Sequence, residues 1–148
     1  MNRVVRIGLI VLGVVVFLAI SGVLARYLTT DNAERDADLG LLKAETAGNA
    51  TALIAQIKGC AASPSCVTLE RSNAKRLRRP GAPKIVNLQS ATANAPDTQT
   101  GPTRIAWIVI GDLPVVQCIL VHRAGNALTG LSVTLLGLSA PIDNSAEC

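Results

Sequence analysis

The feature that most constrains this chain is an uninterrupted run of nineteen residues without a charge, from Ile7 to Ala25. As an α-helix the run is roughly 28 Å long, close to the hydrocarbon thickness of about 30 Å. A helix satisfies its own backbone hydrogen bonds, as lipid requires. The run therefore predicts a transmembrane helix over residues 7–25 that contacts the lipid bilayer, with a cytoplasmic tail of residues 1–6 and an extracytoplasmic domain of residues 26–148.

The charges on either side of the run indicate its orientation. Arg3 and Arg6 precede it, whereas the segment that follows soon becomes acidic, with Asp31, Glu34, Asp36 and Asp38. The positive-inside rule then predicts a single-pass plasma-membrane protein with a cytoplasmic N-terminus and an outer C-terminal domain. The alternative is a secreted protein after signal-peptide cleavage, because Val23-Leu24-Ala25 ends in small residues. Nineteen apolar positions exceed the usual signal-peptide core of about 7 to 15, which favours the anchor.

All of the cysteines lie beyond the run, as expected for a domain that matures in an oxidising compartment. They are Cys60, Cys66, Cys118 and Cys148. Of the three pairings that four cysteines allow, we favour Cys60 with Cys66, which closes a short loop, and Cys118 with Cys148, which ties the C-terminal tail to a strand. A zinc site is the alternative, but the cysteines lack paired close spacings, and the single histidine, His122, is far from Cys60 and Cys66 in the sequence. No metal or cofactor is predicted.

The residues after the run are enough for one small domain. Apolar residues make up 49% of the chain but aromatic residues only 2%, so Trp107 is the single large ring available to the core. The net charge is +4, yet without the three arginines of the first 26 residues there remain eleven basic and ten acidic side chains. The distribution of charge is therefore more informative than its sum.

The first part of the domain has helical periodicity. Apolar or small residues recur every three or four positions from Leu39 to Ile57, which predicts a helix capped by Asp31 or Asn32 that runs to about Lys58. Gly48 and Asn49 are poor helix formers and predict a kink or a break. A shorter helix is expected from Val67 to Arg79, stopped by Pro80-Gly81.

This shorter helix and the segment after it are strongly basic. Between Glu70 and Lys84 there are six basic residues and one acid. Basic residues at helical spacing share a face that can contact polyanions such as envelope polymers. The alternative is a solvated face, paired with the acidic stretch near residue 31. Single-strand binders stack bases on aromatic rings, which this chain largely lacks, so nucleic acid is disfavoured. The candidate polyanion-binding residues are Arg71, Lys75, Arg76, Arg78, Arg79 and Lys84.

The remainder of the chain has strand periodicity. Strands are predicted over residues 84–91, 103–110, 114–123 and 131–135, with a loop from Ala93 to Pro102. The strand Thr103 to Ile110 is apolar at almost every position, which indicates cover on both faces. The fold class is therefore α+β: a transmembrane helix, then two helices packed on a four-stranded antiparallel sheet.

This order of elements resembles the small cystatin-like or NTF2-like domains that bacterial envelope proteins carry outside a single span. The resemblance covers about residues 31 to 140. Segments such as Arg104-Ile105-Ala106-Trp107 and Leu113 to Cys118 are similar to those of uncharacterised membrane-anchored bacterial proteins. The resemblance implies a cone of sheet and helix that serves as a pocket, an active site or a docking surface, and fold alone does not choose among these.

The sequence favours an interaction module without catalytic activity, which binds an envelope protein or an anionic polymer. One alternative is a small-ligand domain with an apolar pocket between the sheet and the long helix. An enzyme would need a dyad such as His122 with Asp112, because the chain lacks the common hydrolase, metal and phosphate motifs. The oligomeric state is not determined by the sequence.

Overall fold

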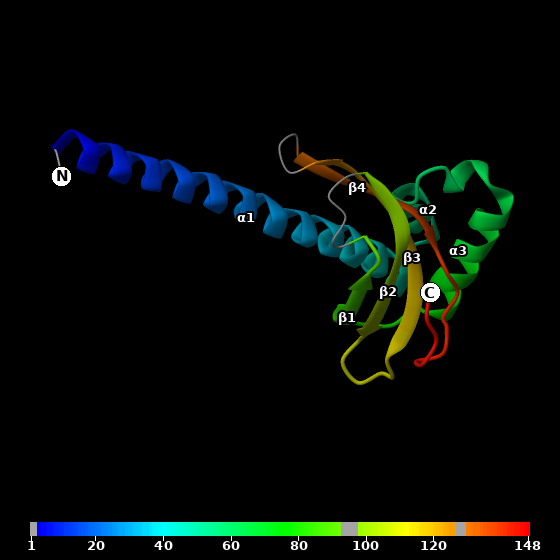
Figure 1. Cartoon of the computed structure of the whole chain (residues 1–148). Coiled ribbons are helices and arrows are strands. Elements are labelled where there is room, and N and C mark those ends of the chain that lie inside the picture. Colours follow the sequence, from blue (N-terminus) through cyan, green and yellow to red (C-terminus); the bar gives the residue numbers. More distant parts are fainter. Residues whose placement is uncertain (1–2, 93–97, 127–129) are drawn as a thin grey trace.

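The computed structural model describes residues 3–92, 98–126 and 130–148. One long helix, α1 (Arg3–Thr46), projects from the domain and carries the N-terminus far from it (Figure 1). The short helix α2 (Ala50–Gln56), the 3₁₀ turn η1 (Cys60–Ala62) and helix α3 (Pro64–Arg76) follow. The strands are β1 (Lys84–Ser90), β2 (Gln99–Ile108), β3 (Val115–Asn126) and β4 (Gly130–Leu138). The predicted α+β class is confirmed.

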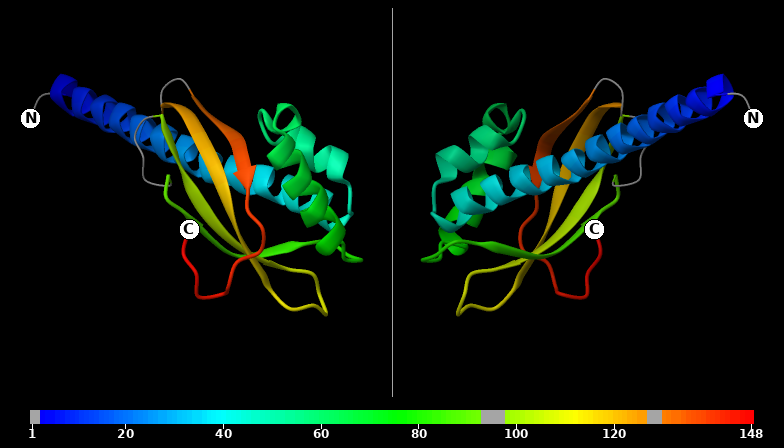
Figure 2. Two further views of the ribbon diagram at one scale, coloured as in Figure 1. Left: turned by 90° about the vertical axis from the view of Figure 1, so that its right-hand side faces the viewer. Right: turned by 90° about the vertical axis from the view of Figure 1, so that its left-hand side faces the viewer.

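The sheet is a plain meander. Its strand order is β1-β2-β3-β4 and every neighbouring pair is antiparallel. The C-terminal half of α1 lies across one face of the strongly twisted sheet, and α2 and α3 close one end of the domain (Figure 2). The C-terminal tail returns along β3, where the backbone N–H of Ile142 donates to the carbonyl of Val116.

The predicted start of a separate helix at Asp31 or Asn32 is wrong. The chain has no glycine or proline from Leu24 to Leu39, so nothing interrupts the helix between its apolar stretch and the domain. Asn32 therefore lies within α1 instead of capping a new helix. The break that the sequence predicts at Gly48 and Asn49 is present: Gly48 takes a positive φ of 70° after α1, and Asn49 Oδ1 accepts from the Ala52 N–H at 3.0 Å to cap α2.

The other predicted elements shift by a few residues. Helix α3 starts at Pro64 and not at Val67, because Ser63 caps it and proline fits the first turn. Strand β2 begins at Gln99, so residues 99–102 of the predicted loop are strand, while residues 93–97 of that loop lie outside the described part. Strands β3 and β4 each extend beyond the predicted ends, because both continue pairing to residues 126 and 130.

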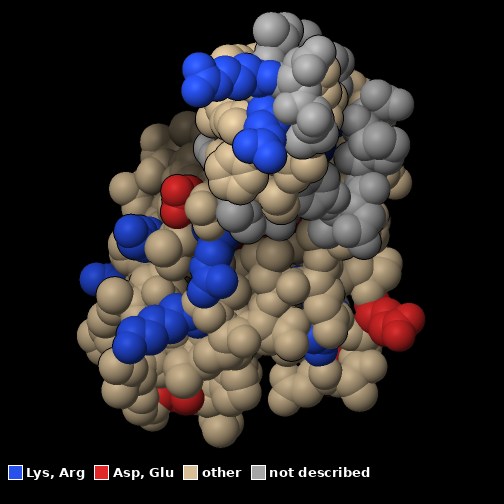
Figure 3. Space-filling view, turned by 60° about the vertical axis from the view of Figure 1, so that its left-hand side comes forward, with Lys and Arg blue, Asp and Glu red and all other residues tan. Residues whose placement is uncertain are grey.

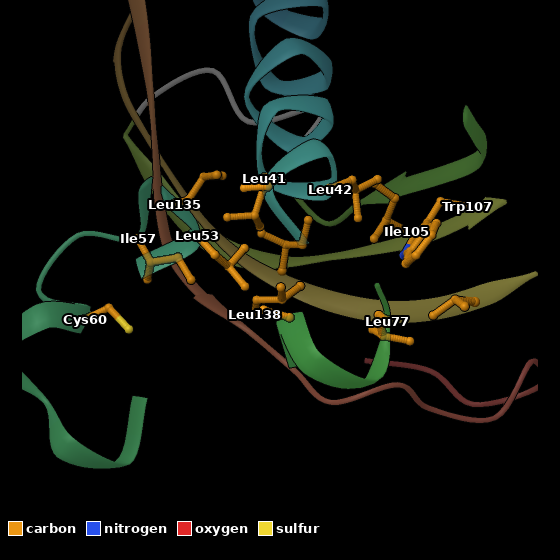
Figure 4. Close-up of a cluster of buried hydrophobic side chains, with 14 of the residues drawn as sticks. Leu41, Leu42, Leu53, Ile57, Cys60, Leu77, Ile105, Trp107, Leu135 and Leu138 are labelled. Carbon is orange, nitrogen blue, oxygen red and sulfur yellow. The ribbon is translucent and has the colours of Figure 1, made fainter. Parts of the chain in front are cut away.

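The core fills the space between α1, α2 and the sheet. Leu41 and Leu42 of α1 meet Leu53 of α2 and Ile105 and Trp107 of β2, and all five are 0% exposed (Figure 4). The predicted cover on both faces of β2 is confirmed, since the tail lies over its other face, where Arg104 Nε donates to the carbonyl of Ala146 at 2.9 Å. The five core side chains pack against one another in one apolar cluster beneath the middle of the sheet.

Both predicted cysteine pairings are present. Cys60 and Cys66 close the loop that leads into α3, with 5.3 Å between their Cα atoms. Cys118 of β3 is bonded to Cys148 at the C-terminus, with 5.8 Å between Cα atoms. The second bridge closes the larger loop and holds the tail on the sheet, and a closed loop restricts the unfolded chain.

Candidate functional site

The basic segment divides into exposed cations and one cation that belongs to the fold. Arg71 and Lys75 lie one helical turn apart on α3 and are exposed, as are Arg76 and Arg78. None of these four forms a salt bridge with a described residue. Lys84 is also exposed but begins β1, away from the helix face. Figure 3 shows Lys and Arg side chains gathered on one side of the domain, with few acidic ones among them.

Arg79 is placed differently from the other candidates. Its guanidinium lies 5.5 Å from the centre of the Trp107 ring, and its Nη1 donates to the Leu113 carbonyl at 2.8 Å. Its Nε is 3.9 Å from Asp112 Oδ2. A cation over an aromatic face stabilises the fold, so Arg79 links the end of α3 to the β2–β3 turn and is not available as an open cation.

Below Arg79 a buried polar network crosses the domain. Trp107 Nε1 donates to Gln117 Oε1 at 2.7 Å, and Gln117 Nε2 donates to Glu45 Oε1 at 2.9 Å. Gln117 Nε2 also donates to the Ser139 carbonyl, which accepts from Asn73 Nδ2 as well. The network therefore connects α1, α3, two strands and the start of the tail through side chains that are at most 1% exposed.

Two carboxyls of this network are buried without full hydrogen bonding. Burial raises the pKa of Glu45 to about 7, and nearby Glu70 acts in the same direction, while the hydrogen bond from Gln117 opposes the shift. Burial likewise raises the pKa of Glu70 to about 7, opposed by a hydrogen bond from Asn73. Glu45 Oε2, Glu70 Oε1 and Asn73 Oδ1 have no hydrogen-bond partner among described residues. Burial therefore shifts both acids toward the protonated, neutral form relative to an exposed glutamate.

A second buried cluster surrounds Glu34, higher on α1. Glu34 Oε1 accepts from Thr103 Oγ1 at 2.7 Å, and its Oε2 accepts from Arg123 Nε at 2.7 Å and also pairs with Arg123 Nη2. Asp38 lies one turn further along, and burial followed by the charge of Glu34 raises its pKa to about 7, against the attraction of Arg123. Glu34 of the acidic stretch therefore pairs with the sheet and not with the basic segment.

Sequence reasoning missed these buried acids, although a signal was present. Glu34, Asp38, Leu41 and Glu45 are spaced by four, three and four residues, so they share one helical face with the core leucines. Acids on the apolar face of a helix that continues a membrane span indicate buried pairing. The predicted helix start at Asp31 or Asn32, just before these acids, is wrong, because α1 has no terminus there.

The candidate catalytic dyad does not form. His122 lies near the far end of β3, where its Nδ1 is 2.6 Å from Thr100 Oγ1 on β2. Asp112 lies in the turn before β3 and contacts Arg79. At about 3.3 Å per strand residue, the length of β3 between Val115 and His122 separates the two groups by about 20 Å. Among the described residues, no cluster of three or more His, Cys, Asp and Glu has a metal-binding arrangement.

The part of α1 outside the domain is apolar and uncovered. Residues Val5–Ala25 form a helix long and apolar enough to cross a membrane, and none of its most apolar stretch is buried by the rest of the chain. An anchor and a signal sequence both have these properties. Together with the two disulfides, this helix indicates a membrane or extracytoplasmic location.

Comparison with protein-family models, with curated proteins and with solved structures found no significant match to this chain. The arguments for function therefore depend on the chemistry of the molecule itself.

Proposed function

We propose that this protein is a single-span envelope protein whose outer domain is a non-catalytic interaction module. The observation that carries the proposal is that the exposed apolar stretch Val5–Ala25 and the buried face from Glu34 to Thr46 belong to one unbroken helix. A helix has no flexible linker, so membrane insertion of one half fixes the height and orientation of the other. A rigid helical connection of this kind would hold the binding surface of the domain at a constant distance from the bilayer.

The charges and the cysteines support an outer position of the domain. Arg3 and Arg6 precede the span, and the positive-inside rule places them in the cytoplasm. Disulfides persist in oxidising compartments, on the opposite side. The arrangement of the helices on the antiparallel sheet resembles the cystatin-like or NTF2-like outer domains, in which the cone of sheet and helix can serve as a docking surface.

Three measurements on the protein in its native membrane test whether the helix anchors the domain. The intact mass should correspond to the full chain, and the protein should stay in the membrane pellet after alkaline carbonate extraction. Protease added to spheroplasts should digest the domain but leave the first residues protected. A mass that begins after Ala25, or release by carbonate, would contradict the anchor.

The exposed cations of α3 support an anionic polymer as one partner. Replacing Arg71, Lys75, Arg76 and Arg78 by serine, with Arg79 retained, should lower the salt concentration that elutes the full-length protein from immobilised polyphosphate. Since each cation that contacts a polyanion releases counterions, the salt dependence should also become less steep. The control is the Lys43→Ser, Lys58→Ser variant, which removes exposed cations elsewhere. Equal elution of the two variants would exclude α3 as the contact surface.

A further inference from the structure

A groove runs between α1 and the edge strand β1. It consists of two adjoining hollows of about 350 Å³ and 260 Å³, which have Arg35 and Ile85 in common. Asn32, Arg35 and Leu39 line it from the helix, and β1 lines it along most of its length from Lys84 to Ser90. The groove exists because α1 crosses the sheet toward β4 and has few contacts with β1.

The floor of the groove consists of apolar side chains at the edge of the core that are only partly buried. Ile85 pairs with Trp107 and Leu88 with Ile105, so both side chains face the same side of the sheet as two fully buried core residues. Residues three apart would normally point to opposite faces, and the bulge at Val86 brings both inward. Ile85 and Leu88 nevertheless remain only partly buried. An apolar side chain from a further strand would complete their burial.

The rim of the groove is positively charged. Arg35 and Lys84 are exposed, and neither forms a salt bridge with a described residue. The third cation in the lining, Arg123, is paired with Glu34 beneath the surface. Among the described residues, those that line the two hollows include no aspartate or glutamate. The charge of the groove therefore complements an anionic occupant.

We propose that this groove binds an extended acidic segment of a partner protein, which adds to β1 as a fifth strand. The proposal rests on the proposed function, because it identifies the partner-binding surface of the same module. β1 ends the order of described strands, and an edge strand offers backbone donors and acceptors to an extended chain. Apolar side chains on the α1-facing side of the segment would cover Ile85 and Leu88, and an acid on that same side would meet Arg35. An acid on the opposite side of the segment would meet Lys84, which faces away from Ile85 in the sheet.

Position and charge argue against two other occupants. Arg35 lies ten residues beyond Ala25 in the same helix, which is about 15 Å along the axis and therefore beyond a headgroup layer about 5 to 8 Å thick. A lipid headgroup does not reach it. A second copy of this chain would bring the same two cations to the groove instead of anions.

The test uses the full-length protein in nanodiscs of zwitterionic lipid and two fluorescent, end-capped hexapeptides. One peptide is Val-Glu-Val-Thr-Glu-Thr, which in a strand carries two valines and one glutamate on one face and the second glutamate on the other. The second peptide has lysine in place of both glutamates. Fluorescence anisotropy should show binding of the glutamate peptide only. Arg35→Glu should weaken that binding about tenfold, as expected when one close charge pair becomes repulsive. The matched control, Arg71→Glu, makes the same charge change on α3 and should alter the affinity less than about twofold. Hydrogen exchange should slow at the amides of β1 when the peptide binds.

The outcomes separate this proposal from the proposed function. Equal binding of both peptides, equal weakening by the two variants, or unchanged exchange in β1 would overturn the groove while leaving the anchored module intact. Cross-links between β1 strands of two copies would overturn it in favour of self-association. Release of the protein from its native membrane by carbonate would instead contradict the proposed function.

Discussion

Along α1, the half from Ile7 to Ala25 has no charged residue and is exposed, whereas the half from Glu34 to Thr46 has three carboxyls that are 0% exposed. The two halves have the same backbone and opposite relations between polarity and burial. In the first half the surrounding medium is expected to be lipid, so apolar side chains need no protein cover. In the second half each buried acid is paired, is hydrogen-bonded or has a pKa that burial raises toward neutral pH. Whether a side chain of α1 is buried in the protein therefore depends on the partner available to it: lipid for the apolar side chains, and protein groups or a proton for the acids.

The largest effect is expected from charging the first half. Val15→Asp with Leu18→Asp places two carboxylates near the centre of the apolar stretch, and each costs about 2.5 to 3.5 kcal/mol in membrane insertion. The protein should leave the carbonate-resistant membrane fraction almost completely. The isosteric pair Val15→Asn and Leu18→Asn should have a smaller effect, because the amides carry no charge. Full retention of the aspartate variant would show that lipid does not surround this half.

In the second half, the pair with the highest cost of disruption is Glu34 with Arg123. Arg123→Ala leaves the Glu34 carboxylate buried without its cation, which typically costs 3 to 5 kcal/mol, so we expect a loss of about that size in the free energy of unfolding. Urea unfolding in detergent micelles, followed through the fluorescence of Trp107, measures it. The double variant Glu34→Met, Arg123→Met should recover most of the loss. No recovery would indicate that Arg123 acts through other contacts.

The pH dependence of stability shows whether the buried acids are protonated or ionised in the folded protein. An unfolded glutamate loses its proton near pH 4, whereas burial holds the pKa of Glu45 at about 7 in the folded state. The folded protein therefore binds more protons between these values, and stability should fall as the pH rises from about 4 to about 7, by about 1 kcal/mol per pH unit for each such group. Asp38 and Glu70 add to the same slope. Urea unfolding at a series of pH values gives the slope.

Two variants test how much of the pH dependence of stability comes from Glu45. Glu45→Gln retains an acceptor for Gln117 but does not titrate, so it should flatten the slope and raise the stability at pH 8 by roughly 1 to 3 kcal/mol. The matched control is Asp36→Asn, which removes an exposed acid of the same helix and should leave the slope unchanged. A slope in Glu45→Gln that equals the slope of the unaltered protein would mean that Glu45 is ionised in the folded protein.

The sequence predicted the local features well and the pairings across the fold poorly. Apolar periodicity identified the span, the stripe through Leu42 and Leu53, and four strands, because these patterns depend on near neighbours in the chain. Spacing also selected the correct cysteine pairs. The partners of Glu34 and Glu45 lie 89 and 72 residues away, and only the packing of α1 on the sheet brings them together.

The same distinction explains the errors at the candidate site. Arg79 resembles its basic neighbours in the sequence, but the turn after β2 brings Trp107 and Leu113 to it. The groove at β1 depends on where α1 diverges from the edge of the sheet, and on a bulge at Val86 that leaves no mark in the apolar pattern. Neither property is encoded in local periodicity.

The smallest expected effect concerns a buried group that is polar but neutral. Thr46 is 3% exposed and its hydroxyl donates to the Leu42 carbonyl at 2.9 Å, within the last turn of α1. Thr46→Val keeps the shape and removes a donor whose acceptor lies in the same helix, so urea unfolding should report a change of about 0.5 to 1 kcal/mol. Leu42→Ala, a cavity at the neighbouring position, should cost about 2 to 5 kcal/mol. If Thr46→Val cost as much as Arg123→Ala, charge would not be what separates the buried acids from other polar groups. The two halves of α1 would then differ only in the polarity of their side chains, and charge would add nothing further.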